Sequence, residues 1–303
     1  MSEQTKCGFV AVLGAPNAGK STLTNRLVGE KVSIVSPKVQ TTRTRVLGIY
    51  MEGDAQILLV DTPGIFDPKK RLDRAMVSAA WTGARDSDLS MVLVDVSQSK
   101  AVVQAEGIIT ALKEQKRKTI LVLNKIDLIQ RDKLLSLSEK LNEIGVFEAT
   151  FMISATKGDG VEGLKKYLVK EMPEGPWLYP EDQASDMPAR LLAAEITREK
   201  LFLQLHQELP YATTVETEEW EQFDNGSIRI AQVIFVQRTS QRAIVLGKGG
   251  QKIKRIGQEA RTELGEIFGT DVHVKLFVKV REKWQDDPSR YTCLLYTSDA
   301  ADE

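Results

Sequence analysis

The sequence is poor in cysteine and histidine, with two residues of each among 303. Cys7 and Cys293 lie far apart and lack the spacing of metal ligands, and His206 and His273 supply no further ligand pair. These absences argue against a zinc site and against a disulfide framework. They are typical of a protein in a reducing compartment.

Long apolar runs and an excess of one charge are also missing. No run approaches the roughly 20 residues of a membrane-spanning helix, and residues 1–6 lack the apolar core of a signal peptide. We therefore expect a cytoplasmic protein, although composition does not exclude peripheral attachment to a membrane. The formal net charge of −1 favours no partner, so a nucleic-acid surface must be a local patch. The sequence does not indicate an oligomer.

The first half of the chain alternates strand-like and helix-like segments, which is typical of a doubly wound α/β domain with a mostly parallel sheet. Strands are expected at 47–50, 55–60, 89–96, 119–123 and 149–153, and helices at 72–84, 102–115, 133–143 and 161–171. The short turn Glu52-Gly53-Asp54 predicts an antiparallel hairpin between the strands on either side of it.

The pattern changes near residue 172, where three prolines within 172–180 forbid a helix or a central strand. A linker is expected to run to about Pro188. A smaller α+β domain follows, with expected helices at 189–207 and 251–268, strands at 212–219, 227–237 and 272–280, and a strand-like apolar run at 244–246. The expected division is a first domain at 1–172, a linker at 173–188, a second domain at 189–285 and a tail at 286–303.

The stretch Gly14-Ala15-Pro16-Asn17-Ala18-Gly19-Lys20-Ser21 follows an apolar strand and leads, through Thr22, into a helix. This order predicts a P-loop, in which backbone N–H groups and the helix N-terminus hold a polyphosphate. Lys20 is expected to reach the β- and γ-phosphates, and the Ser21 hydroxyl to bind Mg²⁺. An ordinary glycine turn is the alternative, and the complete motif in its strand–loop–helix setting disfavours it.

Two more stretches are expected to contact magnesium and the γ-phosphate. Asp61-Thr62-Pro63-Gly64 ends a strand, so that Asp61 can hold Mg²⁺ through water and the Gly64 N–H can bond the γ-phosphate. The stretch Gln40-Thr41-Thr42-Arg43 contains two threonines. If one of them completes the Mg²⁺ shell only when a γ-phosphate is present, the stretch is a switch that GTP orders and hydrolysis releases. We favour Thr42 over Thr41 for this role, against the alternative of a solvated loop.

The stretch Asn124-Lys125-Ile126-Asp127 is expected to select the base of the bound nucleotide. Because a carboxylate only accepts hydrogen bonds, a buried Asp127 pairs with the N1–H and 2-amino group of guanine and rejects adenine. Asn124 is expected to tie this loop to the P-loop, and the Lys125 stem to lie along the base. Ser154-Ala155-Thr156 is expected to offer backbone N–H groups to the guanine O6. A helix N-cap is the alternative for the first of these stretches.

The group that positions the attacking water is missing. Ras-like enzymes have a glutamine after the Asp-x-x-Gly motif, and here Ile65 stands in its place and can orient no water. Hydrolysis is therefore expected to be slow, or to depend on backbone groups, an ion or a partner. In related GTPases an asparagine at the position of Asn17 helps to hold K⁺, and we hypothesise that role here. The candidate catalytic residues are Lys20, Asn17, Thr42 and Gly64.

The second domain contains Gly247-Lys248-Gly249-Gly250 before a basic helix. A Gly-x-x-Gly loop lets the backbone of single-stranded nucleic acid approach closely, as in KH domains. Between Arg242 and Arg261 six basic residues accompany one acidic residue, Glu259. A solvated basic helix is the alternative, and an expected α-β-β-α-β order favours the KH domain. The candidate RNA-binding residues are Gly247, Lys248, Gly249, Gly250, Lys252, Lys254 and Arg255.

In combination, these motifs and Lys252-Ile253-Lys254-Arg255-Ile256-Gly257 resemble the Era family of bacterial GTPases over about residues 7–290. The resemblance implies a GTPase domain that uses GTP, GDP and Mg²⁺, followed by a type II KH domain. It also implies binding to the 3′ region of 16S rRNA, with RNA and not DNA as the partner, and a role in assembling the 30S ribosomal subunit. A cytoplasmic protein, partly peripheral at the inner membrane, is implied as well.

Residues 291–303 depart from the family pattern, as an assembly artefact, a truncation scar or a variable tail would, and we expect them to carry no function. Two other functions remain as alternatives. Ile65 leaves open a nucleotide-sensing RNA-binding module in which turnover is incidental. A P-loop metabolic kinase is poorly supported, because kinases do not need the guanine-reading stretch 124–127.

Overall fold

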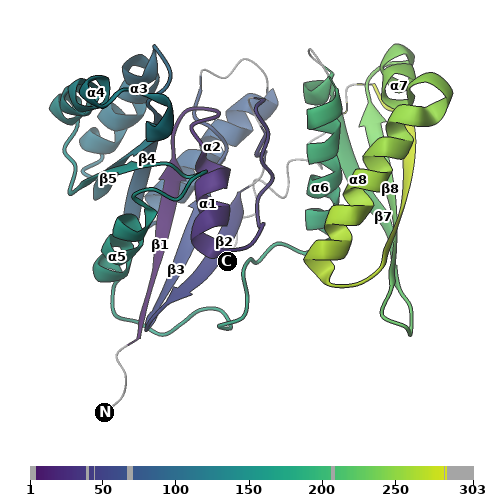
Figure 1. Cartoon of the computed structure of the whole chain (residues 1–303), viewed down its shortest axis with the longest axis horizontal. Coiled ribbons are helices and arrows are strands. Elements are labelled where there is room, and N and C mark those ends of the chain that lie inside the picture. The colour runs from purple at the N-terminus through teal and green to yellow at the C-terminus, as the bar shows by residue number, and fades with distance from the viewer. Residues whose placement is uncertain are drawn as a thin grey trace, which may run out of the picture. The chain divides into compact units, whose positions relative to one another are not determined.

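The computed structural model describes residues 5–38, 41–43, 45–66, 71–205, 209–282 and 284, without the side chains of 71 and 72. The chain folds into two compact units, divided between Asp186 and Met187. Gln40, the end of the helix expected at 189–207 and the tail at 286–303 lie outside the described residues. Figure 1 shows both units, and each is described here by itself.

The first unit is built on a six-stranded sheet with the order β2-β3-β1-β4-β5-β6. Its strands are β1 (Lys6–Leu13), β2 (Val46–Glu52), β3 (Ala55–Asp61), β4 (Leu89–Asp95), β5 (Thr119–Asn124) and β6 (Thr150–Ile153). Only β2 and β3 pair in an antiparallel way; the other neighbours are parallel. The expected doubly wound sheet and its hairpin are therefore confirmed.

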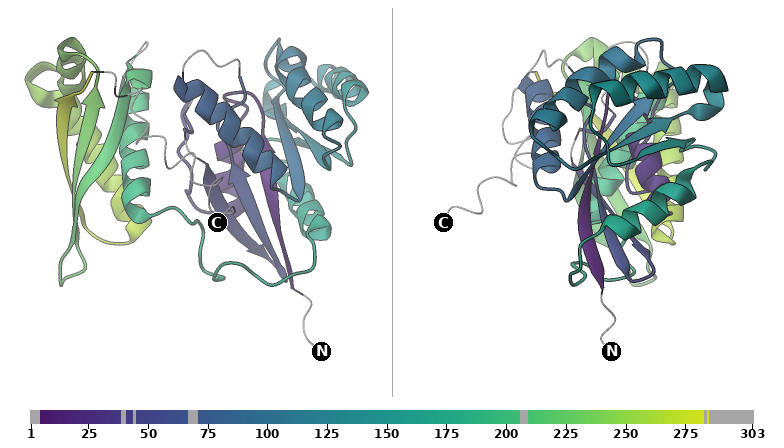
Figure 2. Two further views of the ribbon diagram at one scale, coloured as in Figure 1. Left: turned by 180° about the vertical axis from the view of Figure 1, so that it is seen from behind. Right: turned by 90° about the vertical axis from the view of Figure 1, so that its left-hand side faces the viewer.

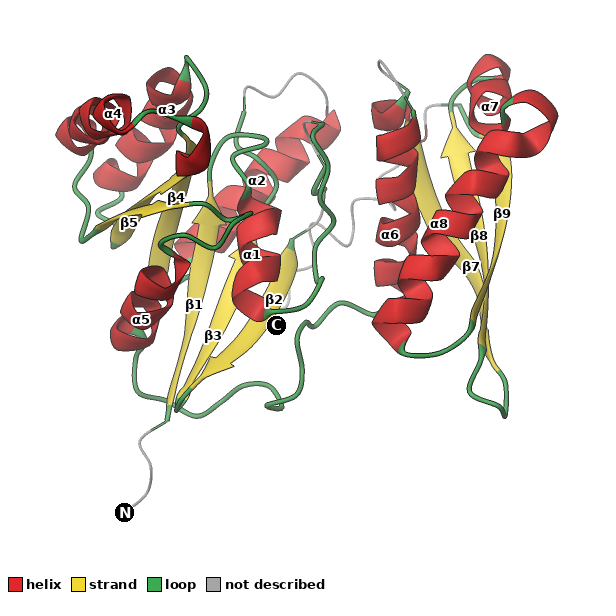
Figure 3. Cartoon of the chain, viewed as in Figure 1, coloured by secondary structure: helices red, strands yellow, loops and turns green. Residues whose placement is uncertain are grey.

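Within the described part of the chain, five helices cover the two faces of this sheet. Helices α1 (Lys20–Val28) and α5 (Val161–Glu171) pack on one face through one apolar cluster. The other face carries α2 (Arg71–Arg85), α3 (Ala101–Glu114) and α4 (Arg131–Ile144), which pack through a second apolar cluster. Figure 3 distinguishes these helices, in red, from the strands, in yellow. Strands covered on both faces are apolar throughout, which explains their continuous hydrophobic runs. The carboxyl ends of the parallel strands meet at one edge, where such sheets bind ligands.

The proline-rich segment 172–186, here called the strap, lies along the sheet and is hydrogen-bonded to it. Its start pairs with the start of β1, because the Cys7 N–H donates to the Pro173 carbonyl at 3.0 Å. Its end pairs with the edge strand β2, where the Ile49 N–H donates to the Ala184 carbonyl at 2.8 Å. Part of the expected linker is thus bound to the first unit.

The second unit is a three-stranded sheet in the order β7-β8-β9 with helices on one face, as the left-hand view of Figure 2 shows. Its elements are α6 (Ala189–Gln204), β7 (Thr213–Gln222), β8 (Ile228–Val236), α7 (Thr239–Leu246), α8 (Gln251–Phe268) and β9 (Val272–Val280). Strand β8 is antiparallel to β7 and parallel to β9. Residues of α6, α7 and α8 share one apolar cluster with the three strands.

One expectation for the second unit was wrong. The apolar run 244–246 is the end of helix α7 and not a strand, so the order is α-β-β-α-α-β. A short apolar run does not distinguish a strand from a helix turn, and here only Val245 is buried while Ile244 is 49% exposed. The helix start is held by Gln241, whose Oε1 accepts from the Gln237 and Arg238 N–H groups.

Among the residues that the structure describes, none of the helices has the length and apolar character needed to cross a membrane.

Candidate functional site

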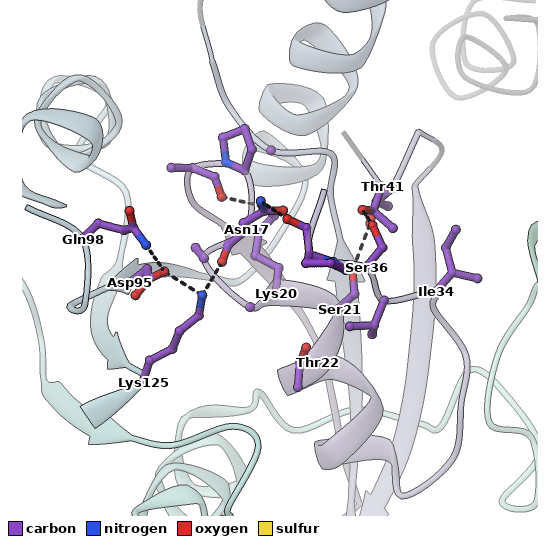
Figure 4. Close-up of a pocket in the computed structure, with 18 of the residues that line it drawn as sticks. Asn17, Lys20, Ser21, Thr22, Ile34, Ser36, Thr41, Asp95, Gln98 and Lys125 are labelled. Carbon is purple, nitrogen blue, oxygen red and sulfur yellow. Dashed lines mark hydrogen bonds and ion pairs between the residues drawn. The ribbon is translucent and has the colours of Figure 1, made fainter. Parts of the chain in front are cut away.

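A cavity of about 490 Å³ opens at the carboxyl edge of the first unit's sheet. Figure 4 shows the side chains that line it. Of the expected nucleotide-binding residues its lining includes Asn17, Ala18, Gly19, Lys20, Ser21, Thr22, Gly64 and Lys125, and it also includes Thr42, the expected metal ligand. The other expected nucleotide-binding residues are not among those that line this cavity: Gly14, Asp61, Thr62, Pro63, Asn124, Asp127, Ser154, Ala155 and Thr156.

The P-loop is shaped for close approach of a ligand to backbone. Gly19 has φ +99°, and a Cβ there would lie 2.3 Å from Asn124 Nδ2, so no other residue fits without movement. Lys20 is buried and donates from Nζ to the Gly14 and Ala15 carbonyls at 3.2 and 3.1 Å. Burial lowers the pKa of Lys20 to about 8, against the opposing effect of Asp61. A phosphate dianion offers this lysine stronger acceptors than the two carbonyls do.

Two hydroxyls and one carboxylate meet below the P-loop. Ser21 Oγ lies 2.9 Å from Thr42 Oγ1 and donates to Asp61 Oδ2 at 2.7 Å. Asp61 Oδ1 is buried and has no hydrogen-bond partner among the described residues. Burial raises the pKa of Asp61, and Lys20 opposes that rise. Hard oxygen donors with an unsatisfied carboxylate oxygen fit Mg²⁺, which would keep the carboxylate ionised.

The structure distinguishes between the two neighbouring threonines. Thr42 is buried and its hydroxyl faces Ser21. Thr41 Oγ1 instead interacts with Ser36 Oγ at 2.7 Å and donates to the Lys38 carbonyl at 2.8 Å. This arrangement supports Thr42 as the residue that joins a metal site.

Asn124 connects three motifs through one side chain. Its Nδ2 donates to the Ala18 carbonyl at 2.8 Å, and its Oδ1 accepts from the Ala155 N–H at 2.9 Å. The expectation of a buried Asp127 was wrong for this structure: the residue as a whole is exposed, although its side chain alone is only 15% exposed and lies 3.6 Å from Lys157 Nζ. A hydrogen bond from Ser154 is the main cause that lowers the pKa of Asp127. An ionised carboxylate is the form that accepts from guanine.

Asp95 is a site residue that the motifs did not reveal. Its carboxylate accepts from Lys125 Nζ at 2.6 Å and from the Ser97 hydroxyl at 2.6 Å. Lys125 also donates to the Asn17 carbonyl at 2.9 Å, so it bridges β4 and the P-loop, as Figure 4 shows. The sequence signal was an aspartate ending an apolar strand, which alone is too common to identify a site.

The stretch after β3 is held against the P-loop by backbone contacts. The Thr62 hydroxyl donates to the Val12 carbonyl at 2.7 Å and so fastens β3 to β1. The Ile65 N–H donates to the Gly14 carbonyl at 3.0 Å, while the Ile65 side chain packs against the apolar cluster of the α2–α4 face. Ile65 therefore has no polar group that faces the cavity.

The Gly-x-x-Gly loop of the second unit connects α7 to α8. Gly249 and Gly250 have φ of +59° and +74°, and a Cβ on either would meet nothing within 4 Å. Open space beside a glycine backbone suits close approach of a nucleic-acid strand. Among the candidate RNA-binding side chains, Lys248, Lys254 and Arg255 are exposed and Lys252 is half-buried. Arg255 also pairs with Glu259 at 2.9 Å.

Comparisons with known proteins cover both units. Residues 9–125 match the 50S ribosome-binding GTPase family, and residues 208–285 match the KH domain family. The chain is 61% identical over 287 residues to GTPase Era of Afipia carboxidovorans, covering 95% of this chain and 93% of that protein. It is 60% identical to GTPase Era of Brucella suis over 95% of this chain and 92% of that protein.

Two solved structures resemble the whole chain. A crystal structure of a variant of Aquifex aeolicus Era bound to GDP·AlF4⁻ superposes with a TM-score of 0.90 at 38% identity, covering 96% of this chain and 99% of that one. The same values hold for a crystal structure of Era in complex with MgGDPNP and nucleotides 1506–1542 of 16S ribosomal RNA.

Proposed function

The chain belongs to the Era family of GTPases, and from that premise we propose how its two units work together. The first unit binds GTP with Mg²⁺ and hydrolyses it to GDP and phosphate. The second unit, a KH domain, binds the 3′ region of 16S rRNA, and the protein assists assembly of the 30S ribosomal subunit. The relative solved with such an RNA and a GTP analogue supports this assignment.

The observation that carries the proposal is the convergence of Ser21, Thr42 and Asp61 beneath Lys20. Ser21 and Thr42 are the proposed direct Mg²⁺ ligands, and Asp61 holds the ion through water. When bound, Mg²⁺ neutralises charge that develops on the phosphate oxygens. Thr42 belongs to the polar stretch 33–45, so a γ-phosphate that recruits it also orders that stretch.

The remaining nucleotide contacts divide between phosphate and base. The phosphates are surrounded by Gly14, Asn17, Ala18, Gly19 and Lys20. Thr22 lies at the start of α1, and Pro63 and Gly64 lie on the opposite side of the phosphates. Asn124, Lys125, Asp127 and the 154–156 backbone bind guanine. Each of these roles is part of the proposal.

RNA binding is assigned to the loop and the first two turns of α8. The backbone at Gly247, Gly249 and Gly250 receives the RNA backbone, and Lys248, Lys252, Lys254 and Arg255 neutralise its phosphates. In this proposal the protein works in the cytoplasm, with partial peripheral attachment at the inner membrane.

The two activities are coupled, in our proposal, through the strap. Its end pairs with β2, the strand that follows the polar stretch 33–45, where the Ser185 hydroxyl donates to the Leu47 carbonyl at 2.7 Å. Its middle is held by Gln56 of β3, the strand that ends at Asp61. A change of the two strands on GTP binding is thereby passed to the segment that leads into the KH domain.

Asp127→Asn tests the nucleotide assignment. Because an amide side chain offers a donor to the 2-position oxygen of xanthine, the variant should lose guanine nucleotide affinity by at least about tenfold and prefer xanthosine diphosphate. Fluorescence titration with GDP, xanthosine diphosphate and ADP measures this preference. Asp132→Asn, in the first turn of α4, is a matched control and should leave all three affinities unchanged. An unchanged GDP affinity in Asp127→Asn would overturn the guanine assignment and favour the kinase alternative.

A further inference from the structure

Arg26 lies on α1, two turns after the P-loop, and reaches the segment 154–158 that follows β6, here called the base loop. Its Nε donates to the Ala155 carbonyl and its Nη2 donates to the Thr156 carbonyl. A Cβ on Gly158 would lie 3.0 Å from Arg26 Nη1, so the guanidinium also covers that glycine closely. Arg26 is otherwise exposed, and no motif identifies it.

The base loop depends on such contacts for its shape, because it is neither helix nor strand. From inside, Asn124 Oδ1 holds the Ala155 N–H. Within the loop, the Gly158 N–H donates to the Ser154 carbonyl at 2.7 Å and the Lys157 N–H donates to Ser154 Oγ at 3.1 Å. Arg26 supplies the contact from the side of α1. The planar guanidinium donates to two successive carbonyls from N–H groups held in a fixed fork, whereas a lysine ammonium is a point charge on a flexible stem.

The two carbonyls matter because of the N–H groups joined to them. The Ala155 carbonyl shares a peptide group with the Thr156 N–H. The Thr156 carbonyl shares one with the Lys157 N–H, which already donates to Ser154 Oγ, so the Thr156 N–H is the donor that matters here. A charged donor on a carbonyl polarises its peptide group and makes the N–H a stronger donor. The same contacts fix the directions in which those N–H groups point.

We propose that Arg26 is a positioning residue that holds and polarises the base loop for recognition of the guanine O6. The proposal rests on the guanine nucleotide function proposed above. In this proposal one helix, α1, contributes to binding at both ends of the nucleotide, because Lys20 and Ser21 serve the phosphates and Arg26 serves the base. Arg26 thus contributes to the choice of base without touching the base.

The test is Arg26→Ala, titrated with three nucleotides. GDP and inosine diphosphate both carry O6, whereas the sulfur of 6-thioguanosine diphosphate accepts hydrogen bonds weakly. Arg26→Ala should weaken GDP and inosine diphosphate equally, by about tenfold, or about 1.4 kcal/mol. The loss for the thio analogue should be about threefold or less. Arg26→Lys should fall between Arg26→Ala and the unmodified protein.

Arg85→Ala is the matched control, because Arg85 is exposed and its described ion pair is with the adjacent Asp86. It should change none of the three affinities. An equal loss for all three nucleotides in Arg26→Ala would reveal a merely structural or electrostatic role and overturn the proposal, as would no loss at all. If the unmodified protein does not prefer GDP to ADP, the nucleotide assignment itself fails, which is a separate result.

Discussion

Asn17 adopts a backbone conformation that is uncommon for a residue other than glycine, with φ +63°. Its Nδ2 donates to the Pro37 carbonyl at 2.9 Å, so its side chain joins the P-loop to the polar stretch 33–45. Strained residues of this kind gather at functional sites. The Ile65 side chain packs against the core, and the hypothesis that Asn17 helps to hold a K⁺ ion stays a prediction.

Replacing K⁺ by Na⁺ should therefore slow GTP hydrolysis by about tenfold. Asn17→Gly keeps the positive φ and removes the amide, so it should be slow in both salts with GDP affinity retained. Asn17→Asp keeps an oxygen ligand and should still respond to K⁺. Phosphate release measured in matched KCl and NaCl buffers checks this prediction, and equal rates in both salts for the unmodified protein would contradict it.

Residues that belong to a motif of fixed spacing were predictable from the sequence, and residues outside such a motif were not. The P-loop and the stretch 124–127 were recognisable because a fixed spacing is required to surround phosphates and to read a base. Asp95 and Arg26 were missed because their partners, Lys125 and the base loop, lie far away in the sequence. Their contacts exist only once β4, β5 and α1 are assembled.

At the scale of elements, a single buried side chain holds the middle of the strap. Gln56, the second residue of β3, is 0% exposed. Its Oε1 accepts from the Leu178 and Tyr179 N–H groups at 2.8 and 3.0 Å, and its Nε2 donates to the Tyr179 carbonyl at 2.8 Å. A buried amide that satisfies three backbone groups is stabilising, because each group would otherwise be desolvated without a partner.

Gln56→Leu should release the strap. Loss of three hydrogen bonds should lower the free energy of unfolding by about 2–3 kcal/mol and speed hydrogen exchange of the strap amides while GDP affinity is retained. Hydrogen exchange detected by mass spectrometry over peptides spanning 174–186 measures the effect. Gln183→Leu is the matched control, since Gln183 Nε2 bonds only the strap's own Ser185 carbonyl among its described contacts. Equal exchange in the two variants would show that Gln56 does not hold the strap.

The strap and α7 also show which features of an element its sequence pattern does not predict. Prolines correctly excluded helix and central strand from 172–180, but they carry no information on which surface the segment lies against. A single polar residue in the apolar run of β3 was the available signal for that contact. The short run 244–246 was wrongly predicted to be strand-like. Its composition does not make it helical; its place between β8 and the Gly-x-x-Gly loop does.

At the scale of the whole molecule, the two units are joined by a segment that belongs structurally to the first. If the strap passes on the nucleotide state, affinity for a single-stranded oligonucleotide of the 16S rRNA 3′ end should differ between nucleotides. We expect binding about fivefold tighter with a non-hydrolysable GTP analogue than with GDP. In Gln56→Leu the ratio of these two affinities should fall toward one, because a released strap no longer follows β2 and β3.

The control for this last prediction separates coupling from RNA contact. Lys254→Ala removes an exposed charge of α8 and should weaken RNA binding in both nucleotide states by the same factor, leaving their ratio intact. Anisotropy titrations of the labelled oligonucleotide at fixed salt measure all of these affinities, since phosphate contacts are strongly salt-dependent. Equal affinities with the two nucleotides in the unmodified protein would mean two independent modules on one chain. Any timing of RNA release by hydrolysis must then come from the ribosome, and GTP turnover by the isolated protein would be incidental to RNA binding.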